Sequence, residues 1–228
     1  MVACFSFEHV GVDPVADGRN DRPAPILDDV CCAMPAGGIT VISGPSGSGK
    51  STLLRLCNRL EVPTRGVVRH RGQDIATLDP VELRRSVGMV FQRPTPFPGT
   101  CLDNLNVARA MGGAAAAELL DRVGLAAELL DRDATTLSGG EAQRLCLART
   151  LATGCDVLLA DECTSSLDPE STAVLEQLAR NLAGAGTTVL WVTHDRAQQA
   201  RLADHRLVLD RGRILDQDSD REVLGGPD

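Results

Sequence analysis

The 228-residue chain has little lysine, few aromatic residues and no long apolar run. Its apolar stretches, such as 157–160 and 189–192, are far shorter than the roughly 20 residues that a membrane-spanning helix needs. The N-terminus lacks the basic flank and apolar segment of a signal peptide, so we expect a cytoplasmic protein. Hydrophobic residues make up 43% of the chain, which supplies a core and excludes disorder as a reading of the whole chain.

The eight cysteines lack the spacing of metal or redox motifs. No C-x-x-C pair occurs, and no Cys/His spacing predicts a zinc site. In a reducing compartment such cysteines are expected to be small buried hydrophobes. We expect the same of Cys163, which directly follows two acidic residues.

The charge balance argues against a nucleic-acid partner. The net charge is −8, whereas duplex binding rests on a basic surface. The basic runs at 69–71 and 84–85 are short and are expected to be solvated. Of the 23 basic residues only Lys50 is a lysine. A compact, flexible ammonium suits a phosphate cradle, where a planar guanidinium would not fit.

Strand-like and helix-like segments alternate along the chain, which predicts an α/β fold. An early antiparallel β region is expected at 2–10 and 26–34. Further strands, apolar throughout as in parallel sheets buried on both faces, are expected at 39–43, 87–91, 156–161 and 187–192. Helices are expected at 50–60, 139–152, 169–183 and 195–203, with a helical block at 100–133 and two last strands near 206–215.

A glycine-rich segment follows the strand expected at 39–43 and opens a helix. It matches G-x-x-x-x-G-K-[ST], in which glycines let backbone N–H groups converge on phosphate oxygens and the helix N-terminus adds a favourable dipole. Lys50 is expected to reach the β- and γ-phosphates, and the Ser51 hydroxyl to bind Mg²⁺. The candidate nucleotide-binding residues here are Gly44, Pro45, Ser46, Gly47, Ser48, Gly49, Lys50, Ser51 and Thr52.

The apolar strand expected at 156–161 ends in two adjacent carboxylates. In open α/β sheets, ligands gather at the carboxyl ends of the strands. Asp161 is expected to bind Mg²⁺ directly or through water. Glu162 is placed to polarise a water for attack on the γ-phosphate, as a general base. A phosphate cradle with an acidic strand end occurs in many nucleotide hydrolases and small-molecule kinases.

Residues 137–144, LSGGEAQR, narrow these alternatives. They closely resemble the signature sequence of ATP-binding cassette (ABC) ATPases, with Glu141 where glutamine is commoner. The same serine and glutamate form a capping-box pattern at a helix start. Three further segments stand where that family has its Q-loop glutamine, D-loop and switch histidine: Gln92, 166–168 and His194. The resemblance covers about residues 26–216.

The resemblance implies an α/β P-loop NTPase fold, with a mixed sheet, an N-terminal antiparallel β region and a small inserted α-helical subdomain. Residues 1–228 would be a single ABC ATPase domain. Within it, residues 1–92 and 137–228 would form the RecA-like and antiparallel-β core, and residues 93–136 the helical subdomain.

The resemblance also implies ATP hydrolysis with Mg²⁺. The implied catalytic residues are Glu162, His194 and Gln92, and the implied metal ligands are Ser51, Gln92 and Asp161. ATP on the cradle of one copy would be covered by residues of a second copy, in a two-fold dimer. The nucleotide-binding residues that lie outside the cradle are Ser138, Gly139, Gly140 and Asp168.

The implied partners are a second ATPase copy and transmembrane permease subunits, with no nucleic acid. Residues 93–100, directly after Gln92, look like the surface that meets the permease. The chain would then lie at the inner face of the plasma membrane, held there by its permease. Hydrolysis would remove the γ-phosphate that joins two copies, so the dimer could open.

Two positions depart from the family pattern. An aromatic residue that stacks on adenine usually follows the first strand, whereas this chain has no tyrosine and Val12 stands at that place. Valine packs against a base but lacks a π face, so we expect weak adenine selectivity, with Arg19 or Arg22 as substitutes that could cover the base. Cys163 stands where proline is common.

The cargo is the least determined property. Residues 87–98 look like the Q-loop region of phosphate-import ATPases. Four other features look more like metal-efflux ATPases described as iron exporters: the short helical block, residues 99–105, residues 189–195 and the missing proline after Glu162. We favour metal efflux slightly over phosphate import, with amino-acid uptake third. A soluble ABC ATPase acting on DNA or ribosomes, a small-molecule kinase and a binding-only module are the competing classes.

Overall fold

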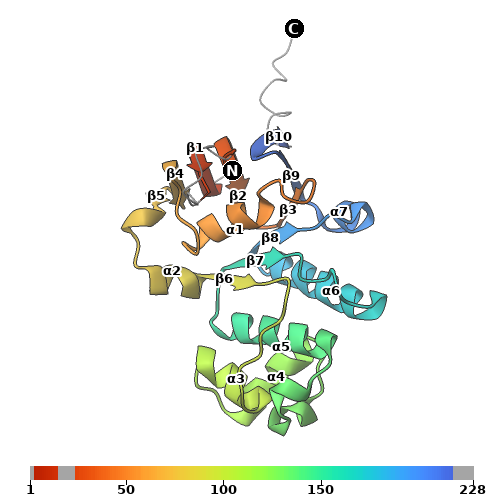
Figure 1. Cartoon of the computed structure of the whole chain (residues 1–228). Coiled ribbons are helices and arrows are strands. Elements are labelled where there is room, and N and C mark those ends of the chain that lie inside the picture. Colours follow the sequence, from red (N-terminus) through yellow and green to blue (C-terminus); the bar gives the residue numbers. More distant parts are fainter. Residues whose placement is uncertain (1–2, 15–23, 218–228) are drawn as a thin grey trace.

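The computed structural model describes residues 3–14 and 24–217, which form two sheets with helices packed around them (Figure 1). Sheet A is antiparallel and contains, in spatial order, β2 (Leu27–Pro35), β1 (Ala3–Val12), β4 (Arg65–His70) and β5 (Gln73–Asp74). Sheet B contains β10 (Arg213–Gln217), β9 (His205–Asp210), β3 (Ile39–Ser43), β8 (Thr188–Val192), β7 (Val157–Asp161) and β6 (Val87–Val90). All strands of sheet B except β10 run parallel.

Two apolar clusters cover the two faces of sheet B. Successive side chains of a strand point to opposite faces. Leu158 and Val189 therefore join one cluster, among the helices, while Leu159 and Leu190 join the other, which lies toward sheet A. Because both faces are buried, β7 and β8 are apolar almost throughout. The predicted α/β class and the parallel strands are confirmed, with strand ends within one residue.

Helix α1 (Lys50–Cys57) packs between the two sheets. Its buried face contributes Leu53, Leu54, Leu56 and Cys57 to the cluster that also contains side chains of β1, β2 and β4. The helix begins at the glycine-rich segment, so this packing fixes the direction in which its N-terminal N–H groups point.

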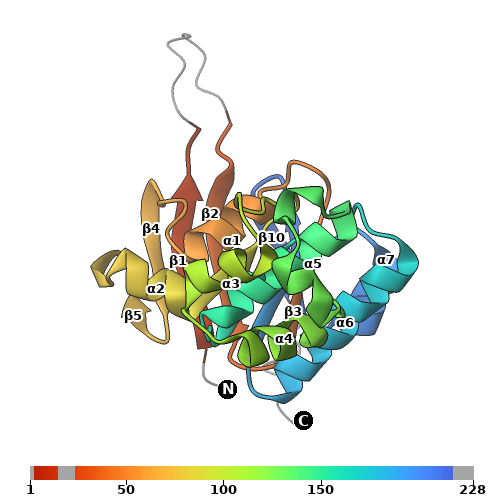
Figure 2. The same ribbon diagram turned by 90° about the horizontal axis from the view of Figure 1, so that it is seen from below.

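A group of helices lies at the opposite end from sheet A (Figures 1 and 2). It contains α3 (Cys101–Ala108), α4 (Gly113–Arg122) and two short 3₁₀ helices, Ala127–Asp131 and Ala134–Thr136. Helix α5 (Gly139–Ala152) packs against α3, α4 and β6. It therefore belongs to both the helical group and the sheet, whereas the expected subdomain boundary at residue 137 assigns it to the core alone.

Two further helices, α6 (Pro169–Gly184) and α7 (Arg196–Leu202), pack against sheet B. Asp168 caps α6 by accepting hydrogen bonds from the Ser171 N–H and hydroxyl, and Asp195 caps α7 in a similar way. Within the described ranges, none of the helices has the length and apolar character needed to cross a bilayer.

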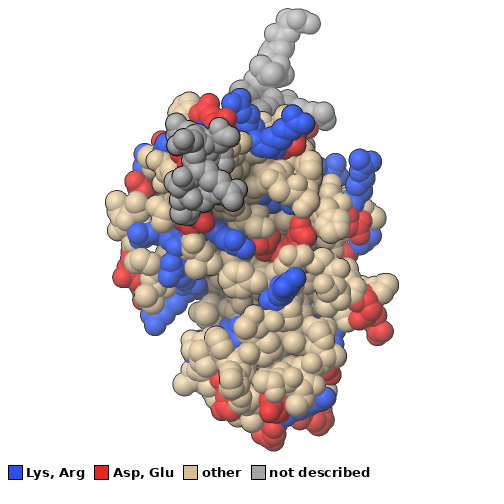
Figure 3. Space-filling model, in the orientation of Figure 1, with Lys and Arg blue, Asp and Glu red and all other residues tan. Residues whose placement is uncertain are grey.

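The segment between α1 and β6 was not assigned from the sequence. It forms β4, β5, a 3₁₀ turn at Ile75–Thr77, and α2 (Pro80–Ser86). The expectation that the basic run 69–71 is solvated was wrong for His70, because β4 buries this residue and burial lowers its pKa. Arg69 pairs with Glu8, and Arg71 with Asp156. Arginines and acidic residues are interspersed on the face in Figure 3.

Two glycines at the two ends of β4 allow a test of the packing of sheet A. Gly66 (φ 79°) lies so close to β1 that an added Cβ would be 2.3 Å from the His9 carbonyl oxygen, whereas Gly72 (φ 83°) has no atom within 4 Å of that position. Gly72→Ala should lower the free energy of unfolding by about 1–2 kcal/mol, the cost of left-handed backbone alone. Gly66→Ala should cost at least about 3 kcal/mol, because β1 must also move. Equal losses in urea titrations would contradict this packing.

Candidate functional site

The glycine-rich cradle connects the end of β3 to the start of α1. Gly44 and Gly49 have positive φ angles of 144° and 101°. A Cβ on Gly44 would lie 1.9 Å from the Leu209 carbonyl oxygen, and one on Gly49 would lie 2.6 Å from Leu27. No side chain caps the helix at Gly49. Backbone N–H groups at the start of α1 are therefore left to bind an anion, as the sequence pattern predicts.

Lys50 is held over the cradle rather than extended into solvent. Its side-chain ammonium donates to the carbonyl oxygens of Gly44 and Pro45, at 3.0 and 2.7 Å. Only 5% of the residue is exposed. A buried ammonium this close to the loop places positive charge next to its N–H groups, which suits a phosphate.

Ser51 and Asp161 join the cradle to the end of β7. The Ser51 hydroxyl donates to Asp161 Oδ1 at 2.8 Å. Burial raises the pKa of Asp161, while the hydrogen bond from Ser51 opposes that shift. A hydroxyl and a buried carboxylate are hard oxygen ligands, the donor set that Mg²⁺ prefers. The residues present therefore fit a magnesium ion at this position.

Glu162 lies next to Asp161 but turns its side chain toward two other predicted residues. Gln92 Nε2 donates to Glu162 Oε2 at 3.4 Å, and His194 Nδ1 lies 3.7 Å from the same oxygen. The backbone of Glu162 is left-handed, with φ 46°, a conformation that is uncommon for a residue other than glycine and that concentrates at functional sites. Because of this sharp turn, the neighbouring carboxylates of Asp161 and Glu162 point to different partners: Asp161 to Ser51, and Glu162 to Gln92 and His194.

A pocket of about 330 Å³ brings most of these residues together. Its lining includes the predicted residues Ser46, Gly47, Gly49, Lys50, Ser51, Thr52, Gln92 and Glu162. It also includes Ile26, which the sequence analysis did not single out. Ser138, Gly139 and Gly140 are not among the described residues that line this pocket.

Ser138 and its neighbours form an exposed helix tip. The Ser138 hydroxyl accepts from the Glu141 N–H at 3.3 Å, and Glu141 Oε2 accepts from the Ser138 N–H at 2.8 Å, so the predicted capping box is present. Hydrogen bonding to Ser138 lowers the pKa of Glu141. A Cβ on Gly139 would meet no atom within 4 Å. The start of α5 is thus preformed and open to an approaching molecule.

Asp168 is linked to α5 through Ser171. Both Asp168 carboxylate oxygens accept from Ser171, at 2.8 Å, and these bonds lower the pKa of Asp168. The Ser171 hydroxyl in turn accepts from Arg144 Nη1 at 2.7 Å. The segment around Asp168 is therefore linked by hydrogen bonds to α5, the helix that Ser138 caps.

Two buried glutamines, missed from the sequence, connect the elements of the site. Gln143 on α5 donates to the Phe91 carbonyl oxygen at 2.9 Å, directly before Gln92. Gln198 on α7 accepts from Trp191 Nε1 at 3.1 Å and donates to Thr164, just after the acidic pair. A single buried glutamine has no sequence pattern, so only the fold reveals what it contacts.

The exposure of Val12 and Ile26 bears on which side chain could contact the nucleobase. Val12 is only 2% exposed, whereas Ile26 is 37% exposed and lines the pocket beside the cradle. Ile26 is therefore an exposed apolar side chain beside the cradle, whereas Val12 is packed in the interior. Arg19 and Arg22 lie outside the described residues.

Cys163 is buried, and burial raises its pKa to about 12, which agrees with the expected inert thiol.

A family model described as "ABC transporter" matches residues 27–165. The chain belongs to the ABC transporter ATPase family. It is 41% identical to the phosphate import ATP-binding protein PstB of Mycobacterium intracellulare, over 94% of this chain and 84% of that protein. The comparison confirms the family resemblance found in the sequence, and the chain is an ATP-hydrolysing transporter subunit that binds ATP.

Two solved structures share this ABC ATPase fold. One is the dimeric ATP-binding cassette MJ0796 in a post-hydrolysis state with ADP and Pi; it is 29% identical, with a TM-score of 0.81, and 94% of this chain and 97% of that chain are covered. The other is a bacterial Atm1-family ABC exporter with ATP bound; it is 33% identical, with a TM-score of 0.79. That match covers 96% of this chain and 39% of the exporter chain.

The aliphatic side chain beside the cradle predicts weak discrimination between nucleobases. Ile26 is placed to pack against either purine and, being aliphatic, stacks on neither. We expect the dissociation constants of Mg-ATP and Mg-GTP to agree within about fivefold, or about 1 kcal/mol. Ile26→Tyr should tighten the binding of both nucleotides, and Ile26→Ala should weaken both. Equilibrium titration of the three proteins tests this, and a large preference of the unaltered protein for ATP would contradict it.

Proposed function

We propose that two copies of this chain close around two ATP molecules and use ATP hydrolysis to drive a membrane permease. The observation that carries the proposal is the division of the site. Lys50, Ser51 and Glu162 share one pocket, while the helix tip at Ser138 and Gly139 is exposed and lies outside that pocket. Such a helix tip, with free N–H groups, is suited to bind a γ-phosphate held by another copy.

On this proposal, the cradle residues Gly44 to Thr52 bind the triphosphate, and Lys50 contacts the β- and γ-phosphates. Ser51, Asp161 and Gln92 would hold Mg²⁺, which supplies positive charge that offsets the charge of the phosphate oxygens. Ser138, Gly139 and Gly140 of the second copy cover the γ-phosphate. Asp168 would act at the same interface, and its hydrogen bonds to Ser171, which contacts Arg144 of α5, support this role.

Hydrolysis then needs a positioned water. Glu162 accepts a proton from this water as the water oxygen bonds to the γ-phosphorus and the bond to the leaving ADP oxygen breaks. Gln92 and His194 both lie within 4 Å of Glu162 Oε2, which is where residues that orient the water and sense the γ-phosphate are needed. Loss of the γ-phosphate removes the link between copies and lets them separate.

The proposed domain division is a core of residues 1–92 and 137–228 with a helical subdomain at 93–136. Helix α5 begins at the boundary and packs on both parts. Its Gln143 holds the carbonyl of Phe91, beside Gln92. A shift of the helical subdomain is therefore coupled to Gln92, so the two parts would move in response to nucleotide.

The proposed permease contact is the segment 93–100 and its surroundings. Buried Asn104 holds this segment by bonding both the N–H and the carbonyl of Phe97, and Arg149 lies over the Phe97 ring at 4.1 Å. Phe91, Phe97 and Val107 are exposed apolar side chains here. An apolar surface that is held rigid suits docking to a membrane subunit, which would place the chain at the inner face of the plasma membrane.

For the cargo we propose phosphate uptake. The support is the 41% identity to a phosphate-import ATPase over nearly the whole chain, together with the Q-loop region 87–98. The slight preference for metal efflux rested on short segments at 99–105 and 189–195 and has no comparable support. Cargo contacts lie on the permease, so the ATPase residues themselves carry little information about them.

Glu162→Gln should trap the closed dimer. The amide keeps the size of the side chain but no longer accepts the proton, so turnover should fall at least 100-fold while ATP binding persists. With Mg-ATP the variant should elute as a dimer in size-exclusion chromatography with light scattering.

The matched control for the trapped dimer is Lys50→Ala, which removes the cradle charge; it should stay monomeric with Mg-ATP and bind ATP more weakly. A Glu162→Gln protein that stays monomeric at saturating ATP would exclude the proposed closure. Normal hydrolysis by that variant would exclude Glu162 as the base.

The cargo is tested in a reconstituted transporter. A permease that co-purifies with this chain from membranes would be placed with it in proteoliposomes and given ATP. Uptake of radiolabelled phosphate, lost with Glu162→Gln, is the expected result. Transport of radiolabelled ferrous iron without phosphate transport would favour metal efflux instead.

A further inference from the structure

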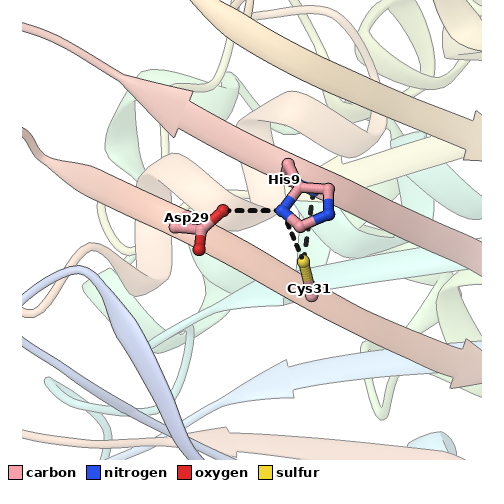
Figure 4. Close-up of side chains that lie close together, drawn as sticks. All are labelled: His9, Asp29 and Cys31. Carbon is pink, nitrogen blue, oxygen red and sulfur yellow. Dashed lines mark hydrogen bonds and ion pairs between the residues drawn. The ribbon is translucent and has the colours of Figure 1, made fainter.

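Three side chains of types that can bind a metal ion meet on the exposed face of sheet A, on neighbouring strands β1 and β2 (Figure 4). His9 Nδ1 lies 2.8 Å from Asp29 Oδ1 and 3.5 Å from Cys31 Sγ. The backbone N–H of His9 also donates to Cys31 Sγ, at 3.2 Å. The three ligand atoms all lie within 4.8 Å of one another. None of these residues lines the pocket beside Lys50.

Irregular strand pairing creates this cluster. Phe7 pairs with Cys32 and Val10 with Val30, so two residues of β1 face one residue of β2 at this point. A second shift follows on β2, between the pairs at Val30 and Leu27. His9 and Asp29 sit at the two irregularities, with left-handed φ angles of 51° and 53°. The bulges turn side chains toward one another that regular pairing would have separated.

The ligand distances are close to those of a tetrahedral metal centre. Zinc binds histidine nitrogen at about 2.0–2.1 Å and cysteine sulfur at about 2.3 Å, which separates the two ligand atoms by roughly 3.6 Å at a tetrahedral angle. The observed separation of Nδ1 and Sγ is 3.5 Å. Asp29 Oδ1 needs to withdraw by only about 0.6 Å to reach the corresponding nitrogen–oxygen edge. The third separation, between Asp29 Oδ1 and Cys31 Sγ, is no more than 4.8 Å.

The charges of the cluster also suit a dication. A thiolate and a carboxylate together balance the two charges of Zn²⁺, and neutral imidazole adds none. The backbone N–H of His9 donates to Cys31 Sγ, which holds the sulfur beside the imidazole. Cys31 is the one exposed cysteine of the eight, all of which lie in the described ranges. A metal from solution therefore reaches this thiol first.

We propose that His9, Asp29 and Cys31 form a binding site for a thiophilic divalent cation, Zn²⁺, with water as the fourth ligand. Three protein ligands leave one tetrahedral position open. The bound ion would join β1 to β2 three residues before Val12 and would be separate from the magnesium position at Ser51 and Asp161. Neither the ligand set nor its geometry depends on the proposed transport function.

The test uses the reduced full-length protein after metal removal with a chelator. Zn²⁺ is titrated against a chromophoric chelator, and Co²⁺ replaces Zn²⁺ for absorption spectra. We expect one equivalent of Zn²⁺ and a Co²⁺ complex with a thiolate charge-transfer band and strong tetrahedral ligand-field bands. A fivefold excess of Mg²⁺ should not displace Zn²⁺, because Mg²⁺ prefers oxygen ligands.

Three variants alter one ligand each: His9→Ala, Asp29→Asn and Cys31→Ser. Asp29→Asn keeps an oxygen donor but loses the carboxylate charge, so it should weaken Zn²⁺ binding less than the other two. His9→Ala and Cys31→Ser should each weaken Zn²⁺ binding at least tenfold, and Cys31→Ser should abolish the charge-transfer band. Cys32→Ala and His205→Ala are the matched controls. Cys32 is adjacent to Cys31 but has its pKa raised to about 12 by burial, so its loss should leave Zn²⁺ affinity within twofold.

Thermal unfolding tests directly whether the bound ion joins β1 to β2. Zn²⁺ should raise the thermal unfolding midpoint of the unaltered protein and of both controls, but not that of Cys31→Ser. The proposal is overturned if the reduced protein binds no Zn²⁺, if Cys31→Ser binds it as tightly as the unaltered protein, or if the Co²⁺ spectrum shows only octahedral coordination. Circular dichroism of each variant without metal establishes that the comparison is made between folded proteins.

Discussion

The parallel direction of sheet B is the constraint on which the site depends. The carboxyl ends of β3, β6, β7 and β8 meet at one edge of the sheet, and they are followed respectively by the cradle, Gln92, the acidic pair and His194. The register pairs Asp161 with Val192, so the acidic pair and His194 leave the sheet at the same level. A shift of one residue in this register would turn Asp161 to the opposite face of the sheet. Burial of both faces fixes the register, and the register in turn fixes which way the Asp161 carboxylate points.

Much of this arrangement was predictable because its signals are local. An apolar run followed by G-x-x-x-x-G-K-S, or by an acidic pair such as Asp161 and Glu162, predicts a strand. It also predicts that ligands bind at the carboxyl end of that strand. Ile26, Gln143 and Gln198 gave no such signal. Gln143 and Gln198 are single residues of ordinary type, and their partners Phe91 and Thr164 lie 52 and 34 positions away. Only the packed fold shows that they contact the site.

The same reasoning explains why cysteine spacing did not reveal the cluster on sheet A. Zinc motifs are recognised when ligands are close in sequence, but Cys31 is 22 residues from His9. Their meeting depends on antiparallel pairing of β1 with β2 and on the two irregularities that place His9 and Asp29 in left-handed backbone. The sequence predicted the antiparallel region but not where its pairing would shift by one residue.

The two buried glutamines show how the edge of sheet B could respond to a second molecule. An amide in an apolar interior is costly to leave unpaired, so Gln143 and Phe91 tend to move together, and so do Gln198 and Thr164. Arg144 and Ser171 extend this linkage from α5 to Asp168. A ligand that contacts the tip of α5 therefore acts on two loops, the one that contains Gln92 and the one that contains Asp168. In the proposed dimer that ligand is the γ-phosphate held by the other copy. The position of Gln92 in one copy would therefore depend on whether the other copy holds ATP or ADP.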